Sequence, residues 1–242
     1  MKTMHLFAGA GGGLLGDLIL GHTPIIAVER DIKRARNLEL RAQTGWFPSL
    51  RVENCDIRSF DGGGWAGKVD LIHAGIPCPR WSTARRGVGD PTDYWPEVAR
   101  ITREVAPKYL FIESVKGIQR EHQRFEDDLW KIGYTLKPAI ITDAASVGAP
   151  HSRERYWAFA YANENGEYVR PKHDETCVLP EVEDCGWWET NPHFLRVDDG
   201  VADRVDRYGL EAAGDGQVPL QMAAAWQLLT SRFENEAQAV NF

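Results

Sequence analysis

The stretch MHLFAGAGGGLL, residues 4–15, decides the fold of this chain. Residues 4–8 form an apolar run that predicts a strand, and the apolar spacing within residues 14–19 predicts a helix directly after it. The glycines between them allow a tight turn and a close approach of the backbone to a ligand at the start of the helix. The turn lacks the G-x-G-x-x-G spacing of dinucleotide sites, and no Lys-Ser/Thr pair follows it to make a phosphate-binding loop.

The same alternation of apolar runs and amphipathic stretches continues through the first half of the chain. We expect further strands at residues 25–28, 70–74 and 109–112, and helices at residues 32–42, 97–105 and 125–132. Because the strand runs do not alternate apolar with polar residues, both faces of the sheet should be covered. The sequence therefore predicts an α/β domain built on a parallel sheet with helices on both faces.

The composition changes after the aromatic run at residues 156–161. Residues 163–213 are polar, acidic and irregular, and a helical pattern returns after Pro219 through Met222, Trp226 and Leu229. We expect a main α/β domain at residues 1–162, a small inserted lobe at 163–213, and a C-terminal segment at 214–242 that rejoins the first domain.

The overall composition is ordinary for a soluble globular protein. The chain has 242 residues, of which 43% are hydrophobic and 26% charged. No apolar run reaches the length of a transmembrane helix and no leader peptide precedes the first strand, so we expect a cytoplasmic protein.

The four cysteines are too few and too scattered to suggest a disulfide framework, so free thiols in a reducing compartment are expected. Cys177 and Cys185 lie near His173 and His193 in the sequence, which leaves a zinc site open there. Because the spacing matches no tight zinc-ligand pattern, ordinary loop residues are the favoured interpretation, and no metal is predicted.

The net charge of −7 argues against a broad basic surface for a nucleic-acid backbone. Any contact with DNA would come from local basic clusters, although a run of arginines can also be a solvated face. The clusters are Arg80 with Arg85 and Arg86, Lys116 with Arg120 and Arg124, and Arg153 with Arg155.

One acidic residue stands at the end of the second expected strand, and another lies in a later loop. Glu29 ends the second strand, where a carboxylate can accept hydrogen bonds from both hydroxyls of a ribose. Asp56 lies in a third loop, where it could meet an adenine amino group. Ligands of open parallel sheets bind beyond the carboxyl ends of the strands, so these loops and the glycine turn should gather there. A glycine-rich turn with unrelated surface acids is the alternative.

The segment GIPCPRWS, residues 75–82, follows the strand at 70–74. Cys78 stands between two prolines, outside regular structure and at the same edge as the cofactor loops. A lone cysteine is commonly a small buried hydrophobe, whereas a nucleophilic cysteine needs electropositive surroundings that stabilise its thiolate. Arg80, Arg85 and Arg86 could supply that field.

This segment resembles the Pro-Cys loop of the DNA cytosine-5 methyltransferase family, and further motifs of that family follow in its order. They resemble the S-adenosylmethionine loop at residues 7–12, the Glu-Asn-Val motif at 112–115, the Gln-x-Arg-x-Arg motif at 152–155, and the C-terminal Gly-Asn-x-x-x-Pro motif at 214–219. The resemblance implies a Rossmann-like class I S-adenosylmethionine-dependent methyltransferase sheet with a small inserted target-recognition lobe. It also implies methyl transfer from S-adenosylmethionine to carbon 5 of cytosine in double-stranded DNA, with S-adenosylhomocysteine as the other product.

The resemblance assigns roles to individual residues. Cys78 would attack carbon 6 of a flipped cytosine, Glu113 would bind N3, and Arg153 or Arg155 would hold the O2 side of the ring. Arg80, Ser82, Arg85 and Arg86 would contact DNA. The cofactor-binding set is Phe7, Ala8, Gly9, Gly11, Gly12, Glu29, Arg30, Asp56, Ile57, Pro77, Trp95, Asp215, Gln217 and Val218.

Three departures from the family pattern affect these assignments. Ser114 and Asp215 each replace an Asn, and His151 stands where a Gln is usual nearby, so the geometry of the Pro-Cys loop and one cofactor contact could differ. The alternatives are methylation of tRNA cytosine and a catalytically silent DNA-binding relative. The short lobe suggests a short recognition sequence, and a monomer is expected.

Overall fold

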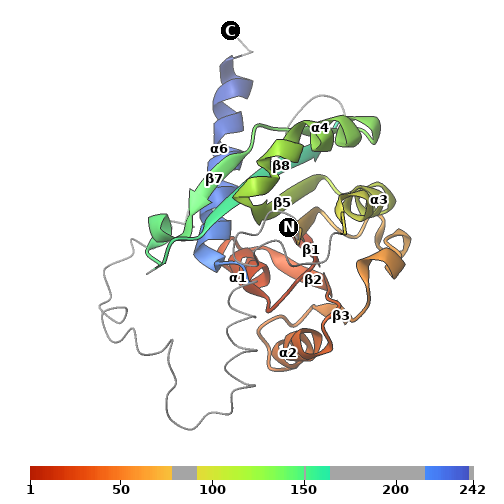
Figure 1. Cartoon of the computed structure of the whole chain (residues 1–242). Helices are drawn as coiled ribbons and strands as arrows, with labels where there is room; N and C mark the ends of the chain where they lie inside the picture. The colour runs from red at the N-terminus through yellow and green to blue at the C-terminus, as the bar shows by residue number, and fades with distance from the viewer. Residues whose placement is uncertain (78–91, 150, 164–215, 240–242) are drawn as a thin grey trace.

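The computed structural model describes residues 1–77, 92–149, 151–163 and 216–239, which form one sheet and the helices around it (Figure 1). The sheet has eight strands in the order β3-β2-β1-β4-β5-β8-β6, with β7 also paired to β8. The strands are β1 (Lys2–Leu6), β2 (Thr23–Val28), β3 (Arg51–Glu53), β4 (Leu71–Gly75), β5 (Tyr109–Val115), β6 (Tyr134–Leu136), β7 (Ile140–Asp143) and β8 (Glu154–Ala162).

Helices cover the sheet on both sides, as the sequence predicted. The helices are α1 (Gly12–Ile19), α2 (Ile32–Gln43), α3 (Trp95–Val105), α4 (His122–Lys131) and α6 (Pro219–Ala239). Short 3-10 turns are η1 (Ile57–Ser59), η2 (Gly63–Trp65), η4 (Lys116–Glu121) and η5 (Ala144–Val147). Among the described helices, none is both long and apolar enough to cross a membrane.

The two faces of the sheet hold separate parts of the core. Along β5, Leu110 and Ile112 pack into the cluster that contains α3 and α4. Tyr109 and Phe111 point the other way, into the cluster that contains Trp226 of α6. Because successive side chains of a strand alternate between faces, a strand with both faces covered must be apolar throughout. The Rossmann-like α/β expectation is therefore confirmed.

The sheet differs from the prediction in the direction of one strand and in having four strands, β3, β6, β7 and β8, that the sequence analysis did not identify. Strands β1 to β5 run parallel, but β8 is antiparallel to β5 and to the edge strands β6 and β7. The sequence predicted a parallel sheet and did not identify β8 as a strand. Residues 156–160 of β8 are all buried, so its apolar run looks the same as that of a buried parallel strand. Composition alone could not give its direction.

The C-terminal helix returns to the sheet beside the first helix (Figure 1). A Cβ atom on Gly16 of α1 would lie 2.6 Å from the Sδ atom of Met222, so glycine is what lets α1 and α6 approach closely. The predicted helix after Pro219 is confirmed by α6. Most of the predicted lobe, with Cys177 and Cys185, lies outside the described residues, and the division into domains stays a prediction.

Candidate active site

The loops that carry the predicted site residues meet at one edge of the sheet. In register, Leu6 at the end of β1 pairs with Val28 at the end of β2 and with Ala74 near the end of β4. Glu113 near the end of β5 pairs with Gly75. The antiparallel β8 starts at this same edge, where Arg155 pairs with Val115 of β5. The parallel order thus gathers the glycine turn, the two acidic loops and Glu113, as predicted.

The glycine turn between β1 and α1 has an unusual backbone. Gly9 and Gly11 have φ angles of 56° and 91°, and Phe7 has a φ of 58°, which is uncommon for a residue with a side chain. Gly11 caps α1, and among the described residues no side chain caps it and no acidic residue stands in its first turn. The positive end of the helix dipole is therefore available to a negatively charged ligand group.

Two glycines of α1 leave room for Gln217 of the C-terminal segment. A Cβ atom on Gly12 would clash with the backbone oxygen of Gln217, and one on Gly13 would clash with the side-chain oxygen of Gln217. Gly12 was assigned to cofactor binding from the sequence. Its role in this structure is to let residues 216–218 lie against the start of α1.

Glu29 ties the glycine turn to the end of β2. Its side-chain oxygens accept hydrogen bonds from the backbone amides of Gly9 at 2.7 Å and Asp31 at 2.8 Å. Each oxygen of a carboxylate has further acceptor capacity, so Glu29 can still receive hydroxyl donors. Arg30 next to it is largely exposed, with a nitrogen 3.9 Å from the Asp56 carboxylate.

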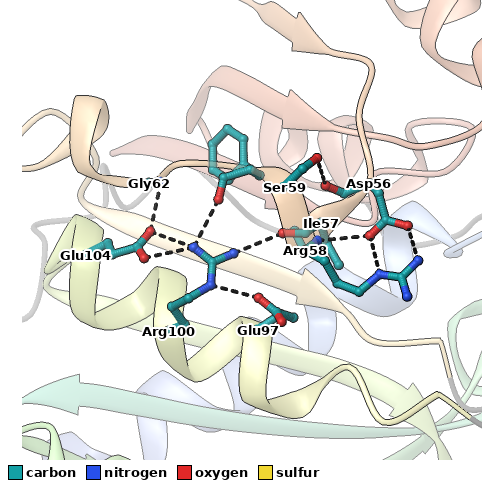
Figure 2. Close-up of polar contacts among 9 residues, drawn as sticks. Asp56, Ile57, Arg58, Ser59, Gly62, Glu97, Arg100 and Glu104 are labelled. Atoms are coloured by element: carbon teal, nitrogen blue, oxygen red, sulfur yellow. Dashed lines mark hydrogen bonds and ion pairs between the residues drawn. The ribbon is translucent and has the colours of Figure 1, made fainter.

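Asp56 stands at the start of the 3-10 turn η1 (Figure 2). The Arg58 side chain donates to both Asp56 oxygens, at 2.9 and 2.6 Å, and the Arg58 backbone amide donates to one of them. These hydrogen bonds hold the pKa of Asp56 well below its usual range. The carboxylate is thus charged at neutral pH, while the neighbouring Ile57 side chain is buried in the core.

Arg100 of α3, which the sequence analysis did not single out, fixes this turn from below (Figure 2). Its guanidinium donates to the carbonyl oxygens of Ile57 and Phe60, each at 3.0 Å. Glu97 and Glu104 hold the guanidinium in place, at 2.7 and 2.8 Å. The signal available in the sequence was the Glu97-Arg100-Glu104 spacing, which places the three side chains on one helix face.

Glu113 is a buried acidic group at this edge. It is 8% exposed, and its carboxylate lies 3.0 Å from Nε of Arg155 and accepts a 3.0 Å hydrogen bond from the Gln217 amide. Burial raises the pKa of Glu113, although Arg155, Gln217 and Arg153 act in the opposite direction. A raised pKa favours the protonated form of a carboxyl group, which can donate a hydrogen bond.

The structure separates the two arginines that the sequence left as alternatives. Arg155 contacts Glu113 directly. Arg153 instead donates a 2.6 Å hydrogen bond to the carbonyl oxygen of Gly216, and its backbone amide donates to Asp143. Arg155 therefore belongs to the immediate surroundings of Glu113, whereas Arg153 joins the start of β8 to the C-terminal segment.

The end of β4 is held in place just before the predicted nucleophile. The hydroxyl of Ser114 donates to the carbonyl oxygen of Ile76 at 2.9 Å, and the Ile76 amide donates to the carbonyl oxygen of Glu113 at 2.8 Å. Pro77 follows directly. The predicted site residues that lie outside the described part of the chain are Cys78, Arg80, Ser82, Arg85, Arg86 and Asp215.

Two other predicted cofactor residues have structural contacts. The indole of Trp95 is 2% exposed, stacks on Phe125 with ring centroids 4.0 Å apart, and donates to Asp128. Val218 accepts a hydrogen bond from the Met222 amide at the start of α6. The Trp95 ring thus faces the core.

The residues at this edge fit the chemistry of S-adenosylmethionine. The start of α1 suits a ligand carboxylate, Glu29 suits ribose hydroxyls, and Asp56 is a charged acceptor for an amino group. The described residues contain no group of three or more His, Cys, Asp or Glu side chains that could hold a metal, and Cys177 and Cys185 lie outside them.

Comparison with known proteins gives one consistent family. A family model described as C-5 cytosine-specific DNA methylase matches residues 1–186. The Type II methyltransferase M.NgoMIV of Neisseria gonorrhoeae is 30% identical over 175 residues, covering 69% of this chain and 54% of that protein. The Type II methyltransferase M.CviJI of Paramecium bursaria Chlorella virus IL3A is 27% identical over 244 residues, covering 97% of this chain and 61% of that protein.

A solved structure supports the fold. The crystal structure of a DNMT2 variant from Spodoptera frugiperda aligns with a TM-score of 0.54 at 22% identity, covering 71% of this chain and 53% of that one. At this identity the likeness bears on the fold alone. The chain spans about half to three fifths of the length of the two Type II relatives named above.

Proposed function

Because this chain belongs to the C-5 cytosine-specific DNA methylase family, we propose that it transfers a methyl group from S-adenosylmethionine to carbon 5 of cytosine in double-stranded DNA. The observation that carries this proposal is the pairing of Glu113 with Arg155 at the edge that also holds the glycine turn and residues 75–77, which lead into the Pro-Cys loop. A buried carboxyl group of raised pKa, next to a fixed guanidinium, suits the polar edge of a pyrimidine.

The cofactor would lie along the carboxyl ends of β1, β2 and β3. S-adenosylmethionine, when bound, supplies an electrophilic methyl group on a positively charged sulfur. The turn at residues 7–12 and the start of α1 would receive its amino acid end, Glu29 its ribose and Asp56 its adenine. The backbone of residues 216–218 would close the site beside Gly12.

Cys78 would act as the nucleophile. Its thiolate would add to carbon 6 of the cytosine, which makes carbon 5 electron-rich enough to accept a methyl group. Loss of the carbon 5 proton, with release of the thiolate from carbon 6, would restore the aromatic ring and the enzyme. A paired cytosine is out of reach inside the duplex, so the base must be flipped out at a cost of a few kcal/mol.

Glu113 and Arg155 would stabilise the charge that this addition creates. Electron density moves toward N3 of the ring when the thiolate adds, and a protonated Glu113 can donate a hydrogen bond there. Burial of Glu113 supports this role because it favours the protonated form. Arg155 would hold Glu113 and face the O2 side of the base.

The test is methyl transfer from tritiated S-adenosylmethionine to duplex DNA, with tRNA as the competing substrate. We expect transfer to DNA, and covalent trapping of the protein on duplexes that contain 5-fluorocytosine. The Cys78→Ala variant should lose both transfer and trapping but keep cofactor binding, measured by calorimetry. Undiminished turnover of Cys78→Ala would refute the covalent mechanism, and transfer to tRNA alone would refute the DNA substrate.

The wider biological setting is proposed from the relatives. Both curated relatives described above are Type II methyltransferases by name, which supports a role in restriction–modification. Recognition of a short DNA sequence by residues 163–213, backbone contacts from Arg80, Ser82, Arg85 and Arg86, a cytoplasmic location and a monomeric state stay predictions. Bisulfite sequencing of DNA treated with the protein would give the target, and a long, strict consensus would contradict the short-site prediction.

A further inference from the structure

The side chain of Gln217 reaches from the C-terminal segment to the acidic group of the site. Its Nε2 atom lies 3.0 Å from a carboxylate oxygen of Glu113 and 3.2 Å from Nε2 of His73. One primary amide therefore lies between a residue at the end of β5 and a residue in the middle of β4. From the sequence, Gln217 was assigned to cofactor binding, but its side chain points to Glu113.

Three glycines lie in close contact with Gln217 and leave room for its side chain and backbone. The side-chain oxygen of Gln217 occupies the space that a Cβ atom on Gly13 would need, and its backbone occupies that of Gly12. A Cβ atom on Gly75 would lie 3.0 Å from the amide nitrogen of Gln217 and 3.5 Å from the Glu113 carboxylate. The side chain is therefore fixed by close contacts as well as by its hydrogen bonds.

The ring of His73 can accept the second hydrogen of the Gln217 amide. The ring is 1% exposed, and burial lowers the pKa of His73 to about 3, so the ring is neutral at physiological pH. A neutral imidazole offers one acceptor nitrogen, and Nε2 in that form accepts one hydrogen of the Gln217 amide. The other hydrogen is then directed at Glu113. This arrangement places the proton of His73 on Nδ1, which has no hydrogen-bond partner among the described residues.

The charged and polar groups around Glu113 come from separate elements. Arg155 belongs to β8, and Arg153 directly precedes that strand. Gln217 belongs to the segment before α6. His73 stands behind Gln217, and its ring packs against His5 with centroids 4.9 Å apart. Gln217 is thus an uncharged donor to Glu113. It binds Oε2 of the carboxylate, whereas Nε of Arg155 lies closest to Oε1.

We propose that Gln217 is a positioning residue that holds the Glu113 carboxyl group in one orientation, through an amide nitrogen that also contacts His73. The proposal rests on the methyl-transfer function proposed above, because it assigns Gln217 to the reactive end of the site. An amide suits this position because it can donate to a carboxylate without adding a charge beside the arginines.

The direct test is the titration of Glu113 in the free protein, followed by NMR of side-chain ¹³C-labelled glutamate and assigned with Glu113→Gln. In Gln217→Met, which keeps the length of the side chain but removes the amide, the pKa of Glu113 should shift upward because its charged form loses a donor. Gln221→Met removes a buried amide of α6 that donates to Thr142 and to the Arg153 carbonyl, and it should leave the Glu113 titration unchanged. An unchanged Glu113 pKa in Gln217→Met would overturn the proposal.

A second variant covers the case in which Gln217→Met does not fold. Gln217→Glu keeps the shape of the side chain and places a second carboxyl group beside Glu113, which should raise the Glu113 pKa further than the Met variant does. This titration needs no turnover, so it decides the contact even if the wild-type protein fails to methylate DNA, which would count against the proposed function alone.

Steady-state kinetics distinguishes a positioning role of Gln217 from a cofactor-binding role. With methyl transfer to duplex DNA as the assay, Gln217→Met should lower kcat roughly 10- to 100-fold because Glu113 is misplaced, while KM for S-adenosylmethionine stays close to that of the wild type. A raised KM with unchanged kcat would instead make Gln217 a cofactor-binding residue and overturn the proposal.

Discussion

The hydroxyl of Ser114 donates a 2.9 Å hydrogen bond to the carbonyl oxygen of Ile76, which joins the end of β5 to the end of β4 two residues before Cys78. The resemblance raised a concern at this position, because the family's usual residue is an Asn that helps to hold the Pro-Cys loop. The contact shows that serine, although shorter, still ties the start of that loop to the strand that carries Glu113. The replacement therefore keeps a link between the start of the segment that carries the proposed nucleophile and the strand that carries Glu113.

Removal of this link should weaken catalysis more than cofactor binding. Ser114→Ala deletes a buried hydrogen bond of about 1 kcal/mol, and we expect kcat to fall roughly fivefold as the loop loses its fixed start. Steady-state kinetics with varied S-adenosylmethionine and duplex DNA would measure it. Ser114→Thr, which keeps a hydroxyl group, is the matched control, and equal rates in Ser114→Ala and wild type would contradict the role.

Replacement of Glu113 should strongly lower the rate of methyl transfer. Glu113→Gln keeps the size of the side chain but removes the proton that would be donated to N3, so the rate should fall about 10²- to 10⁴-fold. Single-turnover transfer of tritiated methyl groups measures the chemical step, and calorimetry with S-adenosylmethionine checks that the cofactor still binds. A near-normal rate would remove Glu113 from the acid role.

Replacement of Arg100 should weaken the binding of S-adenosylmethionine, although Arg100 would not contact the cytosine. Arg100→Met removes the donors to the carbonyl oxygens of Ile57 and Phe60, so the turn that carries Asp56 should loosen. We expect the affinity for S-adenosylmethionine to fall roughly tenfold, since each hydrogen bond from a charged donor contributes about 1.5–3 kcal/mol and part is recovered by water. Arg103→Met, on an exposed part of the same helix, is the matched control. Equal affinities in the two variants would contradict this role.

The buried carboxylate of Asp17 in α1 should make the free energy of unfolding depend on pH. Asp17 is fully buried and accepts hydrogen bonds from Thr3, His5 and His22 at 2.5, 2.6 and 3.2 Å. Burial alone would raise the pKa of Asp17, but the two histidines outweigh it and hold the pKa well below its usual range.

Replacement of this group by Asn should therefore cost most where the carboxylate is charged. Because the folded pKa lies below the ordinary value of 3.8, the stabilisation is present above that value and is lost as the pH falls below it. Asp17→Asn should lower the free energy of unfolding by about 3 kcal/mol at neutral pH. Urea denaturation across the acidic range measures it, and a difference that stays constant down to the most acidic pH would contradict the linkage.

The sequence by itself determined four of the strands of the sheet, β1, β2, β4 and β5, and the edge at which the loops after them meet. The apolar runs around Leu6, Val28 and Ile112 needed burial on both faces, and only a covered sheet provides it. Once those strands are parallel, the residues after them must share one edge, so the glycine turn, Glu29 and Glu113 could be placed together without coordinates. The nucleophile Cys78 was predicted from its neighbours and stays a prediction.

Only the tertiary structure decided which groups touch. Glu113 lies beside Arg155 rather than Arg153, and its second partner, Gln217, is 104 residues away in the sequence. The antiparallel direction of β8, the burial of Trp95 and the Arg100 contacts were likewise outside the reach of local patterns. Local sequence sets the backbone preference and the burial of each segment, whereas the direction of a side chain depends on contacts that distant segments make only when the chain is folded.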